Sequence, residues 1–177
     1  PPETLDLLAG LARERDVWVE LGVQSAHDAT LSAVNRGHDF AASREAARAL
    51  AARGIHVAAH VILGLPGERV GHFRETAGAL RELPLEAVKI HNLHIVRGTA
   101  LAARWRRGEV SVWNESEYAS VLIDFLRHIP WEWPVMRLLS DTPPERLLAP
   151  RWRMKKGQFL HFLEERMRAD GVRQGDR

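Results

Sequence analysis

Polar side chains recur on one face of three stretches of this chain that alternate like β-strands. Residues 17–23, 55–63 and 87–93 show this alternation. Because neighbouring side chains of a strand point to opposite faces, each stretch has one apolar face and one polar face. The polar faces carry Glu20, Gln24, His60, Lys89 and His91. A buried charge is costly unless it is paired, so two interpretations follow: a polar lumen that binds a ligand, or a solvated or ion-paired face.

The turns that follow these strands favour the ligand interpretation. Parallel strands bind ligands at their carboxyl ends, which here fall at residues 22–25, 64–68 and 98–99. Glycines at such ends let the backbone approach a ligand closely, and helix N-termini suit its carboxylate or phosphate.

Two other groups of residues could suggest a metal site or a nucleic-acid patch, and each also has a simpler structural interpretation. His91 and His94 are three residues apart and so lie on opposite faces of a strand, which disfavours joint metal binding even with His56 and His60 nearby. We therefore expect no metal ligands in this chain. The stretch 151–156, RWRMKK, is either a basic and aromatic nucleic-acid patch or a solvated helix start.

The elements between the polar strands predict an α/β fold. Apolar spacing predicts helices over residues 2–16, 28–34, 40–53, 70–83, 100–107, 115–129 and 154–168, and a short strand over 135–139. Strands that alternate with helices form right-handed βαβ units around a parallel sheet. Three such strands leave bare edges, so we expect further strands before Pro1, and we expect the isolated polypeptide to be marginally stable or to aggregate.

The amino-acid composition indicates a globular domain and excludes several classes of protein. The 177 residues are 45% hydrophobic and 27% charged, with a formal net charge of +2, which is typical of a globular domain with little electrostatic steering. No apolar run reaches the roughly 20 residues of a spanning helix, and no signal peptide is recognisable, so we expect a cytoplasmic location without membrane contact. Cysteine is absent, which excludes disulfides and thiolate ligands for zinc or iron–sulfur clusters within these residues.

Taken in order, the motifs resemble the later part of the radical S-adenosylmethionine (radical SAM) barrel. They are VELGVQS at residues 19–25, NRGH at 35–38, HVILGLPGE at 60–68, KIH at 89–91 and GT at 98–99. The chain looks most like the YhcC-type branch, which is related to the elongator catalytic subunit and to oxygen-independent coproporphyrinogen oxidase.

The resemblance implies the C-terminal half of a partial (β/α)6 TIM-like barrel over residues 1–109, followed by a mostly helical extension over 110–177. By analogy with relatives, Gln24 and Arg36 contact S-adenosylmethionine, and Arg36 lies near its carboxylate. His60 stands where coproporphyrinogen oxidase has an aspartate that helps to hold the cofactor. The full set of cofactor-binding residues implied is Glu20, Gln24, Ser25, Arg36, His60, Gly64, Leu65, Pro66 and Leu93, with Lys89 and His91 lining the lumen near the substrate.

The resemblance also implies a [4Fe–4S] cluster in the full-length protein, held by a CxxxCxxC loop that is not in this chain. We expect that loop upstream of Pro1, on an N-terminal half of the same barrel, and we expect this chain alone to be inactive. Relatives act on tRNA and on porphyrinogens, so RNA is one possible substrate. The alternative is a cluster-free binding or assembly module that keeps the barrel shape, and the upstream sequence discriminates between the two.

Overall fold

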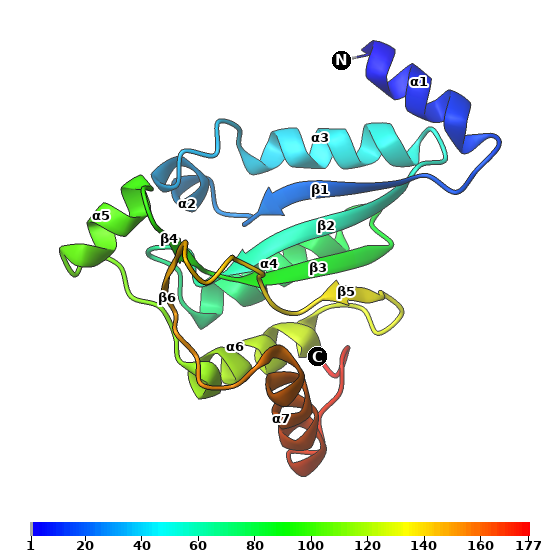
Figure 1. Cartoon of the computed structure of the whole chain (residues 1–177). Helices are drawn as coiled ribbons and strands as arrows, with labels where there is room; N and C mark the ends of the chain where they lie inside the picture. The colour runs from blue at the N-terminus through cyan, green and yellow to red at the C-terminus, as the bar shows by residue number, and fades with distance from the viewer. Residues whose placement is uncertain (1) are drawn as a thin grey trace.

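A parallel four-stranded sheet organises the computed structural model, which describes residues 2–177 (Figure 1). The strands are β1 (Trp18–Gln24), β2 (His56–Leu63), β3 (Ala87–Asn92) and β5 (Val135–Arg137), in the order β1-β2-β3-β5. All neighbouring pairs are parallel. The predicted α/β class, with parallel strands and a helical C-terminal part, is confirmed.

Helices cover one side of this sheet and leave the other side open across β1, β2 and β3 within the described residues (Figure 1). The covering helices are α3 (Phe40–Ala51), α4 (Val70–Arg81) and α6 (Glu115–His128). Their buried faces join the apolar faces of the strands in the main core, where Phe73, Leu80 and Leu122 are almost fully buried. Burial of such side chains provides most of the driving force for this packing.

The remaining helices are α1 (Pro2–Ala12), α2 (Asp28–Ala33), α5 (Ala100–Arg106) and α7 (Lys156–Ala169). Helix α1 has no buried residue, and it ends before residue 16 because the apolar positions stop at Ala12. Helix α7 contributes Phe159 and Leu163 to the main core. Within residues 2–177, no helix combines the length and the apolar character that a bilayer crossing requires.

Two features of the C-terminal part differ from the sequence-based expectation. The segment that was expected to form a strand over 135–139 forms only β5, and β5 extends the main sheet beside β3. A second, antiparallel sheet joins β4 (Ile95–Val96) to β6 (Leu147–Ala149). Strands of two or three residues are too short to show alternation, so periodicity could not reveal them.

Candidate functional site

The register of the sheet places Gly22 and a polar residue of each of the three other strands in one row. Gly22 on β1 pairs with His60 on β2, His60 pairs with Lys89 on β3, and Lys89 pairs with Arg137 on β5. Paired residues of neighbouring strands point to the same face. The open face of the sheet is therefore the polar face that the sequence predicted, with Arg137 as an additional cation that the sequence analysis did not single out.

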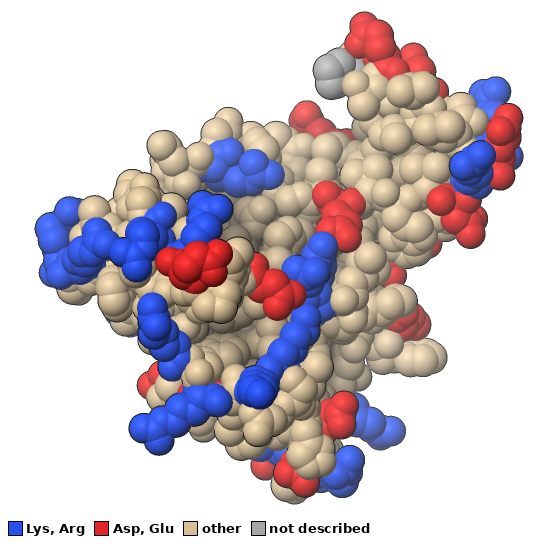
Figure 2. Space-filling model, viewed as in Figure 1, with Lys and Arg blue, Asp and Glu red and all other residues tan. Residues whose placement is uncertain are grey.

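Glu20 and Lys89 form an ion pair across this face. The Lys89 ammonium donates a hydrogen bond to the Glu20 carboxylate, although the two residues lie on strands that are separated by β2. The residue of β2 that pairs with Glu20 is Ala58, whose small side chain leaves room for the contact. The hydrogen bond from Lys89 lowers the pKa of Glu20, so the pair is ionised. Figure 2 shows acidic and basic side chains side by side across the middle of this face.

His60 and His91 lie in contact beside this ion pair. Their ring centroids are 4.1 Å apart, with the ring planes inclined by 54°. The Nε2 atom of each ring is buried and has no hydrogen-bond partner within residues 2–177. Burial lowers the pKa of both rings, that of His91 to about 4, and the charge of Lys89 acts in the same direction. Both imidazoles are thus neutral near pH 7, and each has one buried ring nitrogen without a partner within the described residues.

One end of the polar face lies at the carboxyl end of β1 and is formed by Gln24, Gly22 and Arg36. The pairing of β1 with β2 is bulged between Gly22 and Gln24, and Gln24 has a φ of 69°. That left-handed conformation is unfavourable for a residue with a side chain and is concentrated at functional sites. The side-chain Oε1 of Gln24 is buried without a partner in the described part of the chain.

Arg36 is held against the same strand end. Its Nε and Nη2 atoms donate to the main-chain carbonyl of Gly22, at 3.2 and 2.5 Å. A Cβ atom at Gly22 would lie 2.9 Å from Gln24 Nε2 and 3.0 Å from Arg36 Nη2. Glycine at this position therefore lets an amide and a guanidinium group converge on one point of the backbone.

Ser25 has a different environment from the other predicted residues. It is buried, its hydroxyl donates to Glu68 at 2.5 Å, and the same hydroxyl accepts from the His27 amide at 3.0 Å. Burial raises the pKa of Glu68. Ser25 and Glu68 thus join the turn after β1 to the turn after β2, and Ser25 contributes to the shape of the site through the backbone next to Gln24.

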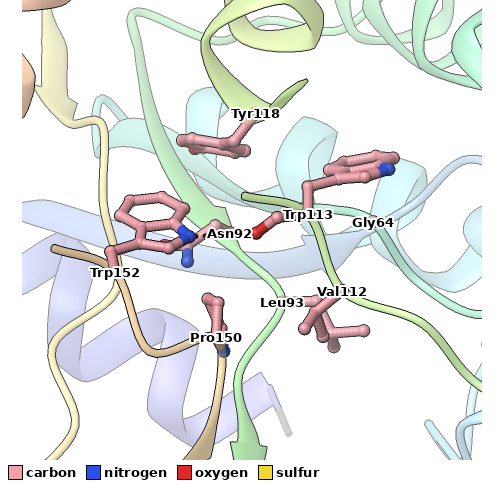
Figure 3. Close-up of a pocket in the computed structure, with 8 residues that line it drawn as sticks. All are labelled: Gly64, Asn92, Leu93, Val112, Trp113, Tyr118, Pro150 and Trp152. Carbon is pink, nitrogen blue, oxygen red and sulfur yellow. Dashed lines mark hydrogen bonds between the residues drawn. The ribbon is translucent and has the colours of Figure 1, made fainter. Parts of the chain in front are cut away.

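The predicted residues of the turn after β2 lie against the C-terminal segment. Gly64 has a φ of +99°, and a Cβ at this position would lie 3.1 Å from the Trp113 ring, which Figure 3 shows beside it. Leu65 and Leu93 are buried in a second apolar cluster with Ile95 and Ala149, while Pro66 is half-buried. Trp113 was not singled out from the sequence, since a lone tryptophan in an irregular segment has no periodic signal.

The stretch 151–156 does not present an exposed aromatic platform. Trp152 stacks on Phe159 with ring centroids 5.1 Å apart, and its Nε1 donates to the main-chain carbonyl of Trp113 at 2.9 Å. The lysine at its end, Lys156, begins helix α7. Of the two interpretations of this stretch, the structure favours the helix start.

Comparison with known proteins gives two matching family models. The model described as the Radical SAM superfamily matches residues 1–80, and the model described as the Radical_SAM C-terminal domain matches residues 85–169. An uncharacterized protein of Methanocaldococcus jannaschii is 40% identical over 177 residues, which cover 99% of this chain and 55% of that protein. Protein YhcC of Escherichia coli K12 is 34% identical over 173 residues, which cover 97% of this chain and 56% of that protein.

More distant matches extend this set. A tRNA uridine(34) acetyltransferase of Methanocaldococcus infernus is 32% identical over 160 residues, which cover 88% of this chain and 29% of that protein. The solved structure of the Elp3 protein of the same archaeon, with an N-terminal deletion, superposes with a TM-score of 0.82 at 23% identity, and covers 96% of this chain and 40% of that one. That likeness shows a shared fold. The chain spans about half the length of these two curated relatives.

Proposed function

Because this chain belongs to the radical SAM superfamily, on the branch of YhcC and the elongator catalytic subunit, we propose that it supplies S-adenosylmethionine and substrate contacts to a radical SAM enzyme. The observation that carries this proposal is the convergence of Gln24, Gly22 and Arg36 at the carboxyl end of β1. Ligands of parallel α/β sheets bind at such strand ends.

The residues present fit S-adenosylmethionine, which carries a carboxylate, an ammonium group and a heteroaromatic base. The Arg36 guanidinium is a planar cation that suits the carboxylate. The buried, unpartnered Gln24 Oε1 is an acceptor for the ammonium or for an exocyclic amine, and the free Nε2 atoms of His60 and His91 are further polar contacts. When bound, S-adenosylmethionine supplies the carbon-centred radical chemistry of the family.

In this proposal the chain's own residues bind and orient. Arg36 and Gln24 hold the cofactor, and the charges of Glu20 and Lys89 balance each other on the same face. His91 faces the substrate side as a neutral hydrogen-bonding group. The turn at Gly64, Leu65 and Pro66, with Leu93, remains a proposed apolar contact for the base.

A [4Fe–4S] cluster belongs to full-length members of the family, but the residues of this chain do not fit it. All 177 residues lack cysteine, which is the ligand that such a cluster requires. We propose that another part of the protein provides the cluster and pairs with β1, which lies at the edge of the sheet in the described residues. The proposed division of this chain remains a barrel half over 1–109 and an extension over 110–177. The extension contributes β5, which pairs with β3 in the main sheet.

RNA is the substrate class that we propose to test first. Its support is the likeness to a protein named tRNA uridine(34) acetyltransferase.

The experiment that tests this function is reconstitution of the protein, at its full natural length, with iron and sulfide without oxygen. We expect iron to be incorporated and, after reduction, 5′-deoxyadenosine to form from S-adenosylmethionine. Gln24→Leu should lower the yield while the iron content stays unchanged. Failure to incorporate iron would instead support the alternative of a cluster-free binding module.

A further inference from the structure

Gln24 lies at the centre of a tight turn that is strained. The Ser25 amide donates to the Val23 carbonyl at 2.9 Å, across Gln24, whose φ is 69°. A hydrogen bond between residues two apart around a positive φ forms a γ-turn of the rare, strained kind. Among the described residues only Gln24 and Asn35 combine a side chain with a positive φ, and asparagine tolerates that conformation better. Such a conformation persists only where the surrounding structure over-determines it.

Two side chains from a later part of the chain hold the residues next to Gln24. Ser25 is 1% exposed, and its hydroxyl donates to the Glu68 carboxylate at 2.5 Å. The main-chain amide of Ala26 donates to the Thr76 hydroxyl at 3.2 Å, and Thr76 is 3% exposed on α4. The turn after β2 and helix α4 therefore fix the backbone that directly follows the strained residue.

The same contacts extend to His27, which precedes α2. Its main-chain amide donates to the Ser25 hydroxyl at 3.0 Å, and its ring Nε2 lies 3.0 Å from the main-chain carbonyl of His72 on α4. The Ser25 hydroxyl thus donates to Glu68 and accepts from His27 at the same time. A single hydroxyl group links the turn after β1 to the start of α2, and its orientation depends on the acceptor at Glu68.

Glu68 is a half-buried carboxyl group whose hydrogen bonds are directed at this segment. Burial raises its pKa, whereas hydrogen bonds from the side chains of Ser25 and Thr30 lower it. Both of these partners lie between Gln24 and Arg36 in the chain. One acceptor group therefore fixes the segment that joins the two proposed cofactor contacts.

We propose that Glu68 is a positioning residue of the site at the carboxyl end of β1, and that it acts through the Ser25 hydroxyl to hold Gln24 in the strained turn. Thr76 assists through the Ala26 amide. The turn keeps the Gln24 side chain on the polar face, where its Oε1 is buried without a partner within residues 2–177. An ordinary φ would redirect that side chain. The effect on S-adenosylmethionine binding rests on the proposed function.

The first experiment measures the affinity of the protein, at its full natural length, for S-adenosylmethionine by equilibrium dialysis. Glu68→Met keeps the length of the side chain but offers no oxygen to the Ser25 hydroxyl, and should weaken binding at least tenfold. Glu68→Gln keeps an acceptor oxygen and should bind within threefold of the unaltered protein. Glu82→Met, at an exposed glutamate at the end of α4, is the matched control and should bind like the unaltered protein. Urea denaturation shows that each protein is folded.

A second experiment measures whether Glu68 acts through the conformation of Gln24. The Cα and Cβ chemical shifts of Gln24 report its φ, and they should leave the left-handed range in Glu68→Met but not in Glu82→Met. Gln24→Gly binds more weakly but adopts a positive φ at little cost. In that background Glu68→Met should therefore cause no further loss of affinity. A role in stability alone would leave the shifts unchanged and would make the two losses multiply.

Three results would overturn the positioning role: a folded Glu68→Met protein that binds S-adenosylmethionine like the control, a folded Glu68→Gln protein that binds as weakly as Glu68→Met, or Gln24 shifts that stay left-handed in Glu68→Met. The first of these results, with tight binding by the unaltered protein, would leave the proposed function standing. If the unaltered protein does not bind S-adenosylmethionine, the proposed function is contradicted, and the Gln24 shifts alone then decide the positioning role.

Discussion

Arg36 donates two hydrogen bonds to the main-chain carbonyl of Gly22, at 3.2 and 2.5 Å, and thereby ties the loop after α2 to the carboxyl end of β1. The two residues are 14 positions apart in the chain. The guanidinium is therefore positioned by the backbone of the sheet before any ligand arrives. A group that is preorganised in this way binds its ligand with less loss of conformational entropy.

Replacement of Gly22 by alanine should disturb this arrangement without unfolding the protein. The new Cβ would lie 2.9 Å from Gln24 Nε2 and 3.0 Å from Arg36 Nη2, and both of these atoms are at the ends of flexible side chains. We expect the affinity for S-adenosylmethionine to fall at least tenfold and the free energy of unfolding to change by less than about 1 kcal/mol. Calorimetric titration measures the first quantity and chemical denaturation the second.

The matched control is Gly10→Ala on α1, where nothing lies within 4 Å of the added Cβ. That change should leave the affinity unaltered and stabilise the helix by about 0.5–1 kcal/mol. If Gly22→Ala binds S-adenosylmethionine as well as this control does, the convergence at Gly22 has no part in cofactor binding.

His91 should make the stability depend on pH between about 4 and 6.5. Its pKa is lowered from 6.5 to about 4, mainly by burial and further by the charges of His60, Arg137 and Lys89. The unfolded chain then binds a proton that the folded chain rejects, so the stability is complete above pH 6.5 and falls as the pH drops toward 4. The loss has an upper limit of about 3 kcal/mol, which partial exposure of the ring reduces.

Urea denaturation at a series of pH values measures this effect. His91→Gln should weaken the dependence across this interval and leave the parts due to His60 and His94, whose pKa values are also lowered by burial. His161→Gln, at an exposed histidine on α7, should retain the dependence of the unaltered protein. A pH profile that is the same in all three proteins would show that His91 is not buried in its neutral form.

The ion pair of Glu20 and Lys89 should contribute little to the free energy of unfolding. Its main effect should be on the pKa of Glu20. Glu20 has a side-chain exposure of 41%, so solvent screens the pair, and a double-mutant cycle should give a coupling of about 0.5–1 kcal/mol. In Lys89→Met, the pKa of Glu20 should rise toward its ordinary value, which an NMR titration of the carboxyl group measures. An unchanged pKa would mean that the contact does not form in solution.

Tyr118 offers a test of the connection between the sheet and the C-terminal segment. It is fully buried in α6, and its hydroxyl donates to the main-chain carbonyl of Leu138 at 2.7 Å. Tyr118→Phe leaves that carbonyl without its partner and should lower the free energy of unfolding by about 1–2 kcal/mol. Ser116→Ala on the exposed part of the same helix is the control, and an equal effect of both changes would argue against the buried hydrogen bond.

The sequence predicted the polar face because the alternation of polar and apolar residues shows which side chains of a strand share a face. Parallel pairing of β1, β2 and β3 then places these faces on the same side of the sheet. Glu20, His60, Lys89 and His91 therefore come together as expected. Arg137 could not be placed, because β5 has three residues and reaches the sheet only after a long connection. Ser25 could not be recognised as a contact of Glu68, since nothing in the chain relates two turns that are 43 residues apart.

The contacts at the carboxyl end of β3 were equally hidden from sequence reasoning. His94 was considered only for metal binding, and its contact with Thr142 depends on a segment that follows 48 residues later. Trp152 was considered only as part of a basic and aromatic patch, yet it hydrogen-bonds to Trp113, whose ring lies against Gly64, and both tryptophans line the small cavity at Asn92. Irregular segments position side chains through tertiary packing, which local periodicity does not encode.

The most direct test of the central claim is the affinity of the full-length protein for S-adenosylmethionine, measured by equilibrium dialysis for the unaltered protein, Arg36→Ala and Arg44→Ala. Arg44 is an exposed arginine on α3 and serves as the control for loss of a positive charge. The account predicts that Arg36→Ala binds at least tenfold more weakly, whereas Arg44→Ala binds like the unaltered protein and all three remain folded. Equal affinity of the folded Arg36→Ala protein would contradict the assignment of the cofactor site to the end of β1.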